Sequence, residues 1–192
     1  MMTGMERNGD VVQLASYAPL FNRIGHSQWT PDMIWFDADK VVLTPSYYVQ
    51  KLFSDYTGDA ALDLNGQEKK LRESKLYISA VKDKTANAKI IKIANGSDEE
   101  QTLALTDKAG KVLEGKAEFV RLAASSGTAK KVVATDAIGT TGGTKAVSPA
   151  VMSNLKVCEK RAPESVAYTV SKEKLSGEIT IPAKSVVVVK LM

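Results

Sequence analysis

The sequence predicts a mainly β protein, in which an antiparallel sandwich or barrel follows a shorter α/β segment. From residue 76 onward, short runs rich in β-branched residues alternate with turn signals at regular spacing, which is typical of antiparallel sheets. Residues 10–53 differ, because they hold both tryptophans, three of the four phenylalanines and the only histidine. The 192 residues suffice for one large domain or two small ones, and this asymmetry indicates two pieces of different character.

Composition excludes several classes of protein. Hydrophobic residues make up 44% and charged residues 25%, as in ordinary soluble domains. The net charge of +4 is spread over scattered lysines, which favours a solvated surface over nucleic-acid binding. No apolar run has the length of a membrane span, and the N-terminus lacks the apolar region of a signal peptide. We therefore expect no nucleic-acid partner and no membrane association. The sequence leaves the cellular compartment undetermined and is compatible with a periplasmic or secreted parent protein.

The single cysteine, Cys158, excludes an internal disulfide and a multi-cysteine metal site. We expect no metal and no cofactor.

The front piece begins with helical signals. Residues 2–8 have the character of a helix end that Asn8-Gly9 stops. Asp10 can cap a second helix over residues 10–20, where apolar residues recur at three- and four-residue spacing until Pro19 ends or bends it. The run Met33–Phe36 is continuously apolar, as in a strand buried on both faces.

A second short extended run, Val41–Leu43, follows a turn at residues 37–40. Thr44-Pro45 is a strong helix start, and apolar residues then recur at helical spacing as far as Tyr56. Two helices around one strand cannot bury both faces of that strand, so the front piece is predicted to be an incomplete α/β layer.

Turn residues divide the back piece into strands. We interpret Asn95-Gly96-Ser97, which also fits a glycosylation sequon, as a tight turn. Residues 125–128 (SSGT) and 139–144 (GTTGGT) are expected to be flexible loops. The expected strands lie at 76–81, 89–93, 101–106, 111–113, 117–122, 167–170, 177–181 and 185–191.

The residues do not assemble a complete active site by themselves. A nucleophile triad requires a histidine, and His26 is better explained as a solvated loop residue. Glycoside hydrolysis requires two carboxylates on either side of one bond. Asp32 stands where a barrel would present functional loops. The other acidic residues of the front piece are Glu6, Asp10, Asp37, Asp39 and Asp55.

Four motifs in the front piece nevertheless point to one family. They are ERNGDVV, ASYAPLF, the W-x-P-D-x-I-x-F-D pattern from Trp29 to Asp37, and TPSYYVQ from Thr44 to Gln50. Together they closely resemble the end of the catalytic barrel of family 51 glycoside hydrolases, the α-L-arabinofuranosidases, in the subgroup shared by plants and gut bacteria. LYISAVKD at Leu76 and the closing SVVVVKLM fit the C-terminal sandwich of that family.

The resemblance implies a domain layout. Residues 1–57 would be the last unit of a (β/α)8 barrel, with residues 10–20, 33–36 and 45–56 as its seventh helix, eighth strand and eighth helix. Residues 58–75 would be a linker, and residues 76–192 a jelly-roll-like antiparallel β-sandwich. The two catalytic glutamates of the family would lie upstream of Met1, so no catalytic residue is expected in this chain.

The resemblance also implies candidate sugar contacts. In the family, the loop after the seventh helix contributes to the arabinose pocket. Trp29 is the candidate wall of that pocket, Asp32 a candidate polar contact and Asn22 a third candidate. Each has a purely structural alternative: a packed rim tryptophan, a cap at the start of a strand and a loop asparagine.

The sequence therefore resembles a C-terminal fragment of a retaining enzyme that removes terminal arabinofuranosyl groups from arabinan or arabinoxylan. The fragment itself would be inactive, and the polysaccharide would bind through the missing barrel. The alternative is a stand-alone structural or sugar-binding sandwich, for which Tyr77, Phe119 and Tyr168 are few aromatic residues.

Without the barrel, apolar side chains of the front piece would lack neighbours. We expect it to fold back on the sandwich or to form a homo-oligomer through the barrel remnant, and self-association is favoured. The side chains concerned are Trp35, Phe36, Leu52 and Phe53.

Overall fold

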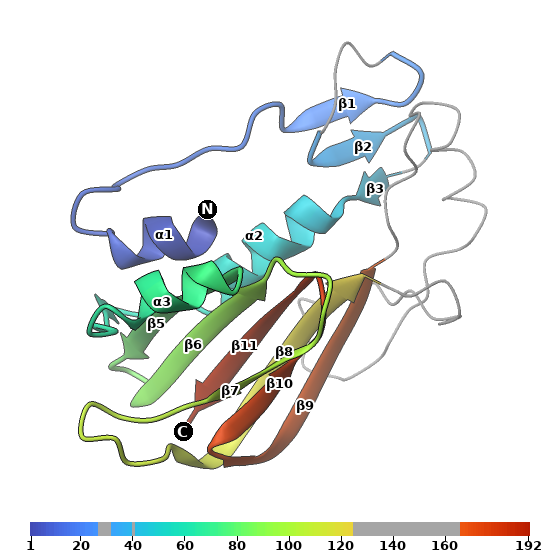
Figure 1. The fold of residues 1–192 in the computed structure, drawn as a ribbon. Helices are drawn as coiled ribbons and strands as arrows, with labels where there is room; N and C mark the ends of the chain where they lie inside the picture. Colours follow the sequence, from blue (N-terminus) through green and yellow to red (C-terminus); the bar gives the residue numbers. More distant parts are fainter. Residues whose placement is uncertain (27–31, 40, 125–165) are drawn as a thin grey trace. The chain divides into compact units, whose positions relative to one another are not determined.

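A computed structural model describes residues 1–26, 32–39, 41–124 and 166–192 of the chain (Figure 1). The chain divides into two compact units. The sandwich unit comprises residues 1–13, 52–123 and 169–192, and the small-sheet unit comprises residues 14–51 and 124–168. The described residues do not include the expected loops at 125–128 and 139–144, nor Cys158 and Trp29.

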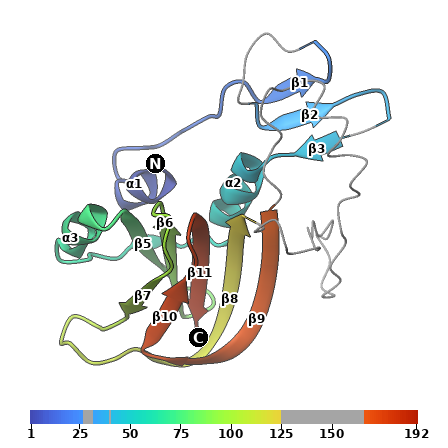
Figure 2. The same cartoon turned by 45° about the vertical axis from the view of Figure 1, so that its right-hand side comes forward.

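The sandwich unit is built on a six-stranded sheet, with a two-stranded antiparallel sheet, β7–β10, as its second layer (Figures 1 and 2). In the large sheet, β11 lies between β6 and β8 and pairs antiparallel with both. The order of the large sheet is β4 (Ala60–Ala61), β5 (Leu76–Asp83), β6 (Ala88–Asn95), β11 (Ser185–Leu191), β8 (Glu114–Ala124) and β9 (Val166–Ser176), and the small layer pairs β7 (Gln101–Ala104) with β10 (Glu178–Ile181).

The main core lies between these two layers. Alternate residues of the large sheet point into it, because successive side chains of a strand face opposite sides. Ile93 and Val187 are fully buried there against Ile181 of β10. Leu62, Leu64 and Leu71 are partly buried against the same core, the last from helix α3 (Gln67–Glu73). The other buried members are Leu76, Ile78, Ala80, Ile91, Leu105, Ala117, Phe119, Leu175, Ile179 and Val189.

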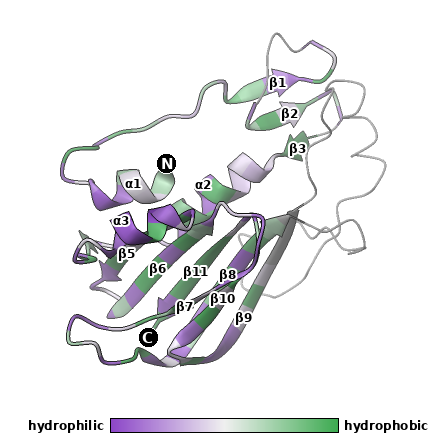
Figure 3. Cartoon of the chain, viewed as in Figure 1, coloured by the Kyte–Doolittle hydropathy of each residue, from purple (hydrophilic) through white to green (hydrophobic). Residues whose placement is uncertain are grey.

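The opposite face of the large sheet is buried as well. Its central strands carry apolar residues on both sides, and in Figure 3 green bands alternate with purple along β6, whereas β11 is mostly green. Val188 and Val120 have no exposed surface, and Ile90 has 1%. Helix α1 (Met2–Arg7) lies over β5 and β6 on this face, where the Arg7 guanidinium donates to the carbonyl oxygen of Ile78.

One lysine is buried among these apolar residues. Lys92 of β6 has no exposed surface, and its ammonium forms an ion pair with Glu6 of α1. The Ser79 hydroxyl donates to the other Glu6 carboxylate oxygen at 2.5 Å, and the Lys92 Nζ lies 4.7 Å from the centre of the Phe53 ring. Burial lowers the pKa of Lys92 from its usual 10.5, an effect that the hydrogen bond and charge of Glu6 oppose.

The small-sheet unit contains three short strands: β1 (Phe21–Arg23), β2 (Ile34–Phe36) and β3 (Val41–Leu43). β2 pairs parallel with β1 and antiparallel with β3. Helix α2 (Pro45–Asp55) follows β3. Its last turn, from Leu52, belongs to the sandwich unit.

Most expected elements are confirmed. The tail is mainly β and antiparallel, and the helix expected at 45–56 is α2. The expected strand at 111–113 is reduced to a single bridge between Thr106 and Val112. The helix end at residues 2–8 is α1.

The helix expected at residues 10–20 is wrong, because these residues contain no helix. Val11 is 76% exposed and Leu14 is 91% exposed, so the apolar spacing has no buried face to stabilise a helix. The expectation that β2 is buried on both faces is also wrong, since Phe36 is 37% exposed. Trp35, Leu52 and Phe53, by contrast, do not lack neighbours: all three are buried.

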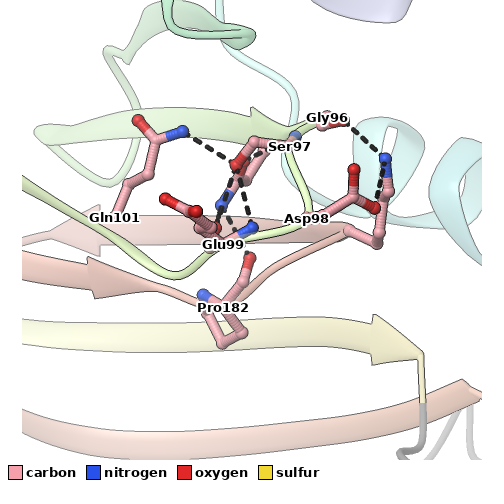
Figure 4. A network of polar contacts seen from close by, with 8 residues as sticks. Gly96, Ser97, Asp98, Glu99, Gln101 and Pro182 are labelled. Carbon is pink, nitrogen blue, oxygen red and sulfur yellow. Dashed lines mark hydrogen bonds and ion pairs between the residues drawn. The ribbon is translucent and has the colours of Figure 1, made fainter.

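The turn after β6 is held by side chains (Figure 4). Asn95 is 3% exposed, and its carboxamide Nδ2 lies within hydrogen-bonding distance of the carbonyl oxygens of Glu99, Ile181 and Pro182. Its Oδ1 accepts from the backbone N–H and the hydroxyl of Ser97. These bonds join the β6–β7 turn to the end of β10, which supports the interpretation of Asn95-Gly96-Ser97 as a turn instead of a glycosylation site.

The two partners of the Lys92–Glu6 pair should differ in how much their removal lowers the free energy of unfolding. Glu6→Gln leaves a fully buried ammonium without its counter-charge and should lower the free energy of unfolding by about 3 kcal/mol. Lys92→Met leaves only Glu6, whose side chain is 16% exposed, and should cost less, about 1 kcal/mol. The double variant should approach the stability of the wild type, as measured by urea unfolding.

The pH dependence provides a second readout of the same variants. Because the folded pKa of Lys92 is lowered, the unfolded chain binds more protons between that pKa and 10.5. The free energy of unfolding contributed by this residue should therefore rise with pH across that window, and Lys92→Met should remove the rise. Equal and additive losses in both single variants, with no change in pH dependence, would contradict the account of this pair.

Candidate functional site

Two of the three candidate sugar contacts are joined by a hydrogen bond. Asn22 is the central residue of β1 and lies opposite Trp35 of β2 in the parallel register. Its Nδ2 donates to Asp32 Oδ2 at 2.5 Å, so the carboxamide and the carboxyl group are held together. Asn22 is half-buried, whereas Asp32 is 1% exposed. Asp32 therefore lies behind Asn22, as a group that orients it.

Backbone hydrogen bonds fix the position of Asp32. The N–H of Ile34 donates to the carbonyl oxygen of Leu20 at 3.0 Å, which aligns the start of β2 with the start of β1. The N–H and the hydroxyl of Thr44 both donate to the carbonyl oxygen of Met33, at 3.2 and 2.8 Å. Thr44, whose carbonyl oxygen accepts the first backbone hydrogen bonds of α2, therefore also closes the β2–β3 hairpin next to Asp32.

One of the two carboxyl oxygens of Asp32 has no hydrogen-bond donor among the described residues. Asp32 Oδ1 is buried and has no hydrogen-bond partner within the described part of the chain. A buried acceptor without a donor costs roughly 1–3 kcal/mol. Such groups are uncommon in folded proteins, and a role in binding or catalysis is one physical reason for a protein to keep one. This oxygen is the feature of the small-sheet unit that burial alone does not explain.

The three-stranded sheet has one closed and one open face. Asn22, Trp35 and Val42 are in register on the closed face, where Trp35 is 1% and Val42 is 6% exposed. Phe21 and Phe36 project from the open face and meet edge to face, with ring centres 6.4 Å apart. Val41, which pairs with Phe36, is 64% exposed on the same face.

The remaining candidates have ordinary environments. His26 is exposed, as the loop interpretation expects. Asp37 caps its own turn by accepting from the N–H of Ala38 at 2.8 Å. Glu6 is committed to Lys92 and Ser79. Trp29, the expected wall of the sugar pocket, belongs to residues 27–31, so its position stays a prediction.

Lys92 is the residue that sequence reasoning missed. The run Lys89-Ile-Ile-Lys-Ile93 predicts a strand but does not show which of its lysines is solvated, and Lys92 is buried. The available signal is the pair of adjacent isoleucines beside it, since consecutive apolar residues indicate a strand covered on both faces. A lysine in the middle of such a strand requires an anion, which the sequence does not identify.

Neither metal nor membrane features occur in the described residues. No group of three or more histidine, cysteine, aspartate or glutamate side chains there could hold a metal ion. The helices found there are too short or too polar to cross a bilayer.

Comparison with known proteins places these features in one family. The sequence profile described as the α-L-arabinofuranosidase C-terminal domain matches residues 1–185. α-L-Arabinofuranosidase A of Aspergillus kawachii is 36% identical over 107 residues, which are 55% of this chain and 16% of that protein. An extracellular exo-α-L-arabinofuranosidase of Streptomyces chartreusis is 52% identical over 58 residues, or 30% of this chain and 7% of that protein.

Solved structures of α-L-arabinofuranosidases agree with this family assignment. An arabinose-bound GH51 α-L-arabinofuranosidase superposes on 100% of this chain and 26% of its own, with a TM-score of 0.67 and 27% identity. The arabinose complex of the Thermotoga maritima enzyme covers 99% of this chain and 36% of its own, with a TM-score of 0.63 and 16% identity, which compares the fold alone. This chain thus spans a minor part of each enzyme that it matches.

The sandwich and its preceding elements define the C-terminal part of a glycoside hydrolase. The chain belongs to the α-L-arabinofuranosidase C-terminal domain family, which confirms the resemblance to family 51.

The orphan oxygen of Asp32 leads to a prediction about stability. Asp32→Ala removes the acceptor of the Asn22 Nδ2 hydrogen bond and should lower the free energy of unfolding by roughly 1–3 kcal/mol. Asp32→Asn keeps an acceptor for Asn22 and replaces a buried carboxyl group by an amide, so it should leave stability unchanged or raise it. Thermal unfolding of the two variants measures the difference. Asp37→Asn, in an exposed turn, is the control, and a loss in Asp32→Asn as large as in Asp32→Ala would contradict this account.

Proposed function

We propose that this chain forms the C-terminal part of a retaining α-L-arabinofuranosidase that removes terminal arabinofuranosyl groups from arabinan, arabinoxylan or related plant polysaccharides. The observation that carries the proposal is the family match over residues 1–185, supported by the superposition of the whole chain on an arabinose-bound enzyme. The sandwich then supports a catalytic barrel, and the polysaccharide binds to that barrel.

Catalysis in this proposal depends on residues outside the chain. Retaining hydrolysis requires one carboxylate as acid and base and a second as nucleophile. The described acidic residues of the front segment are poor candidates: Glu6 is neutralised by a buried lysine, and Asp32 is bonded to an amide and hidden from solvent. This chain contributes neither catalytic carboxylate, and its own role is positioning.

We further propose that Asn22 touches the sugar, that Asp32 orients Asn22, and that Trp29 forms an apolar wall next to them. The bond from Asn22 Nδ2 to Asp32 fixes the rotation of the carboxamide, and part of Asn22 remains accessible. In this proposal a sugar hydroxyl donates to Asp32 Oδ1, the buried acceptor that has no donor within the described residues.

The alternative, a sugar-binding sandwich, is weakened by one observation. Of the three aromatic residues that could form a binding platform, Phe119 is 3% exposed and belongs to the main core. Tyr77 is 38% exposed, and the side chain of Tyr168 lies outside the described residues. A structural sandwich is therefore the better alternative function.

The first test is activity. The purified chain should not turn over an aryl α-L-arabinofuranoside, because it lacks both carboxylates of the mechanism. In an active enzyme that contains this segment, Asn22→Ala should raise KM by about ten-fold through the loss of a sugar hydrogen bond. If the isolated chain turned over the substrate, and a substitution within this chain abolished that turnover, the proposal that both catalytic carboxylates lie outside the chain would be disproved. An unchanged KM in Asn22→Ala would disprove the role of Asn22.

The third proposal concerns self-association of the isolated chain through the open face of β1–β2–β3. Phe21, Phe36 and Val41 expose 60%, 37% and 64% of their surface on this face. Exposed apolar patches favour association. Sedimentation velocity should show a concentration-dependent dimer that Phe36→Ser weakens, with Val170→Ser, on another exposed strand, as the control. A monomer at every concentration would rule this proposal out.

A further inference from the structure

The chain contains three Asn-Gly dipeptides in different environments: Asn8-Gly9, Asn65-Gly66 and Asn95-Gly96. Asparagine before glycine is open to a spontaneous reaction, because glycine has no side chain to hinder the approach of its backbone nitrogen to the asparagine carboxamide. The reaction needs a carboxamide that is free to rotate and a backbone N–H that is not engaged elsewhere. The folded structure supplies these conditions unequally.

Asn65-Gly66 is the most open of the three. Both residues have positive φ, 51° and 77°, and the N–H of Gln67 donates to the carbonyl oxygen of Leu64 at 3.1 Å, as in a type I′ turn. Both residues are exposed, and nothing lies within 4 Å of a Cβ built on Gly66. Within the described chain, neither the Asn65 carboxamide nor the Gly66 N–H has a hydrogen-bond partner.

Asn95-Gly96 is closed. The Asn95 carboxamide is buried. Its NH2 group lies within hydrogen-bonding distance of three carbonyl oxygens, and its Oδ1 accepts from the backbone N–H and the hydroxyl of Ser97. The N–H of Gly96, which would have to attack, donates to the carbonyl oxygen of Lys75 at 2.9 Å. Reaction at this site requires the β6–β7 turn to open first.

Asn8-Gly9 is intermediate. Asn8 is exposed at the end of α1, but its Nδ2 donates to the carbonyl oxygen of Gly4 at 2.7 Å. Within the described chain, the asparagine carboxamide therefore has no hydrogen bond at Asn65, one at Asn8 and several at Asn95.

We propose that Asn65-Gly66 is a site of covalent self-modification, at which the folded protein converts asparagine to aspartate and isoaspartate. The Gly66 nitrogen attacks Asn65 Cγ, a C–N bond forms, and the amide nitrogen leaves as ammonia with the proton of Gly66. Water then opens the resulting succinimide at either carbonyl. The net change is the uptake of one water and the release of one ammonia, with no oxidant or cofactor.

The modification alters the turn in front of α3. The new carboxylate lowers the formal net charge of +4 by one unit. Isoaspartate also inserts a methylene into the main chain between Leu64 and α3, both of which are anchored to the main core through partly buried leucines. The modified chain should expose α3 and its connection more often than the fresh chain.

The test is peptide mapping by mass spectrometry after incubation of the folded chain at mildly alkaline pH. Asn65 should gain about 1 Da in mass at a rate at least about ten-fold above that of Asn95, with Asn8 between them, because several hydrogen bonds must break before Asn95 can react. Asn65→Gln, which would have to form a larger ring, should remove the charge change seen by ion-exchange chromatography.

The same incubation in denaturant is the control. Unfolding removes the structural differences, so the three sites should then react at similar rates. The proposal is overturned if Asn95 reacts as fast as Asn65 in the folded chain, or if the three rates remain as far apart in denaturant as in the native protein. In the second case the neighbouring sequence, and not the fold, would determine the order.

Discussion

The structure depends on how one buried ammonium is accommodated. β6 and β11 are central strands of a sheet that is covered on both faces. Lys92 lies on the face opposite the main core, where it is fully buried. Removing the counter-charge of a buried ammonium is costly, about 3–5 kcal/mol, because the remaining charge is neither solvated nor paired. The counter-charge comes from Glu6, 86 residues earlier in the chain. This requirement makes α1 part of the sandwich unit, although it is far from β6 in sequence.

Other contacts follow from the same requirement. Ser79 donates to Glu6 from the neighbouring strand, and Arg7 donates to the backbone of β5. Phe53, at the end of α2, places its ring beside the ammonium. The outer face of the sheet is thus covered by elements from the segment that carries the family motifs. Within the sandwich unit, this cover is therefore held by charge as well as by apolar packing.

The sequence predicted the elements whose signals are local. Turn signals such as Asn95-Gly96 separated the strands, and Thr44-Pro45 placed the start of α2, because turn chemistry and capping act within a few residues. The helix at residues 10–20 failed because apolar spacing indicates a helix only where a partner buries the resulting face. α1 has only six residues, and a helix of that length is held by tertiary contacts that the sequence does not reveal. The candidate site was found through the family motifs. Its main feature, the orphan oxygen of Asp32, depends on burial and could not be predicted from residue types.

The central claim is that α1 is an integral part of the sandwich because Glu6 neutralises Lys92. Native-state amide hydrogen exchange tests it most directly, since a six-residue helix in isolation would give no protection. If the claim is correct, the hydrogen-bonded amides in the second half of α1 exchange slowly and in step with those of β5 and β6, and Glu6→Gln accelerates both. Exchange of α1 at the rate of an unfolded peptide, while β6 stays fully protected, would contradict the claim.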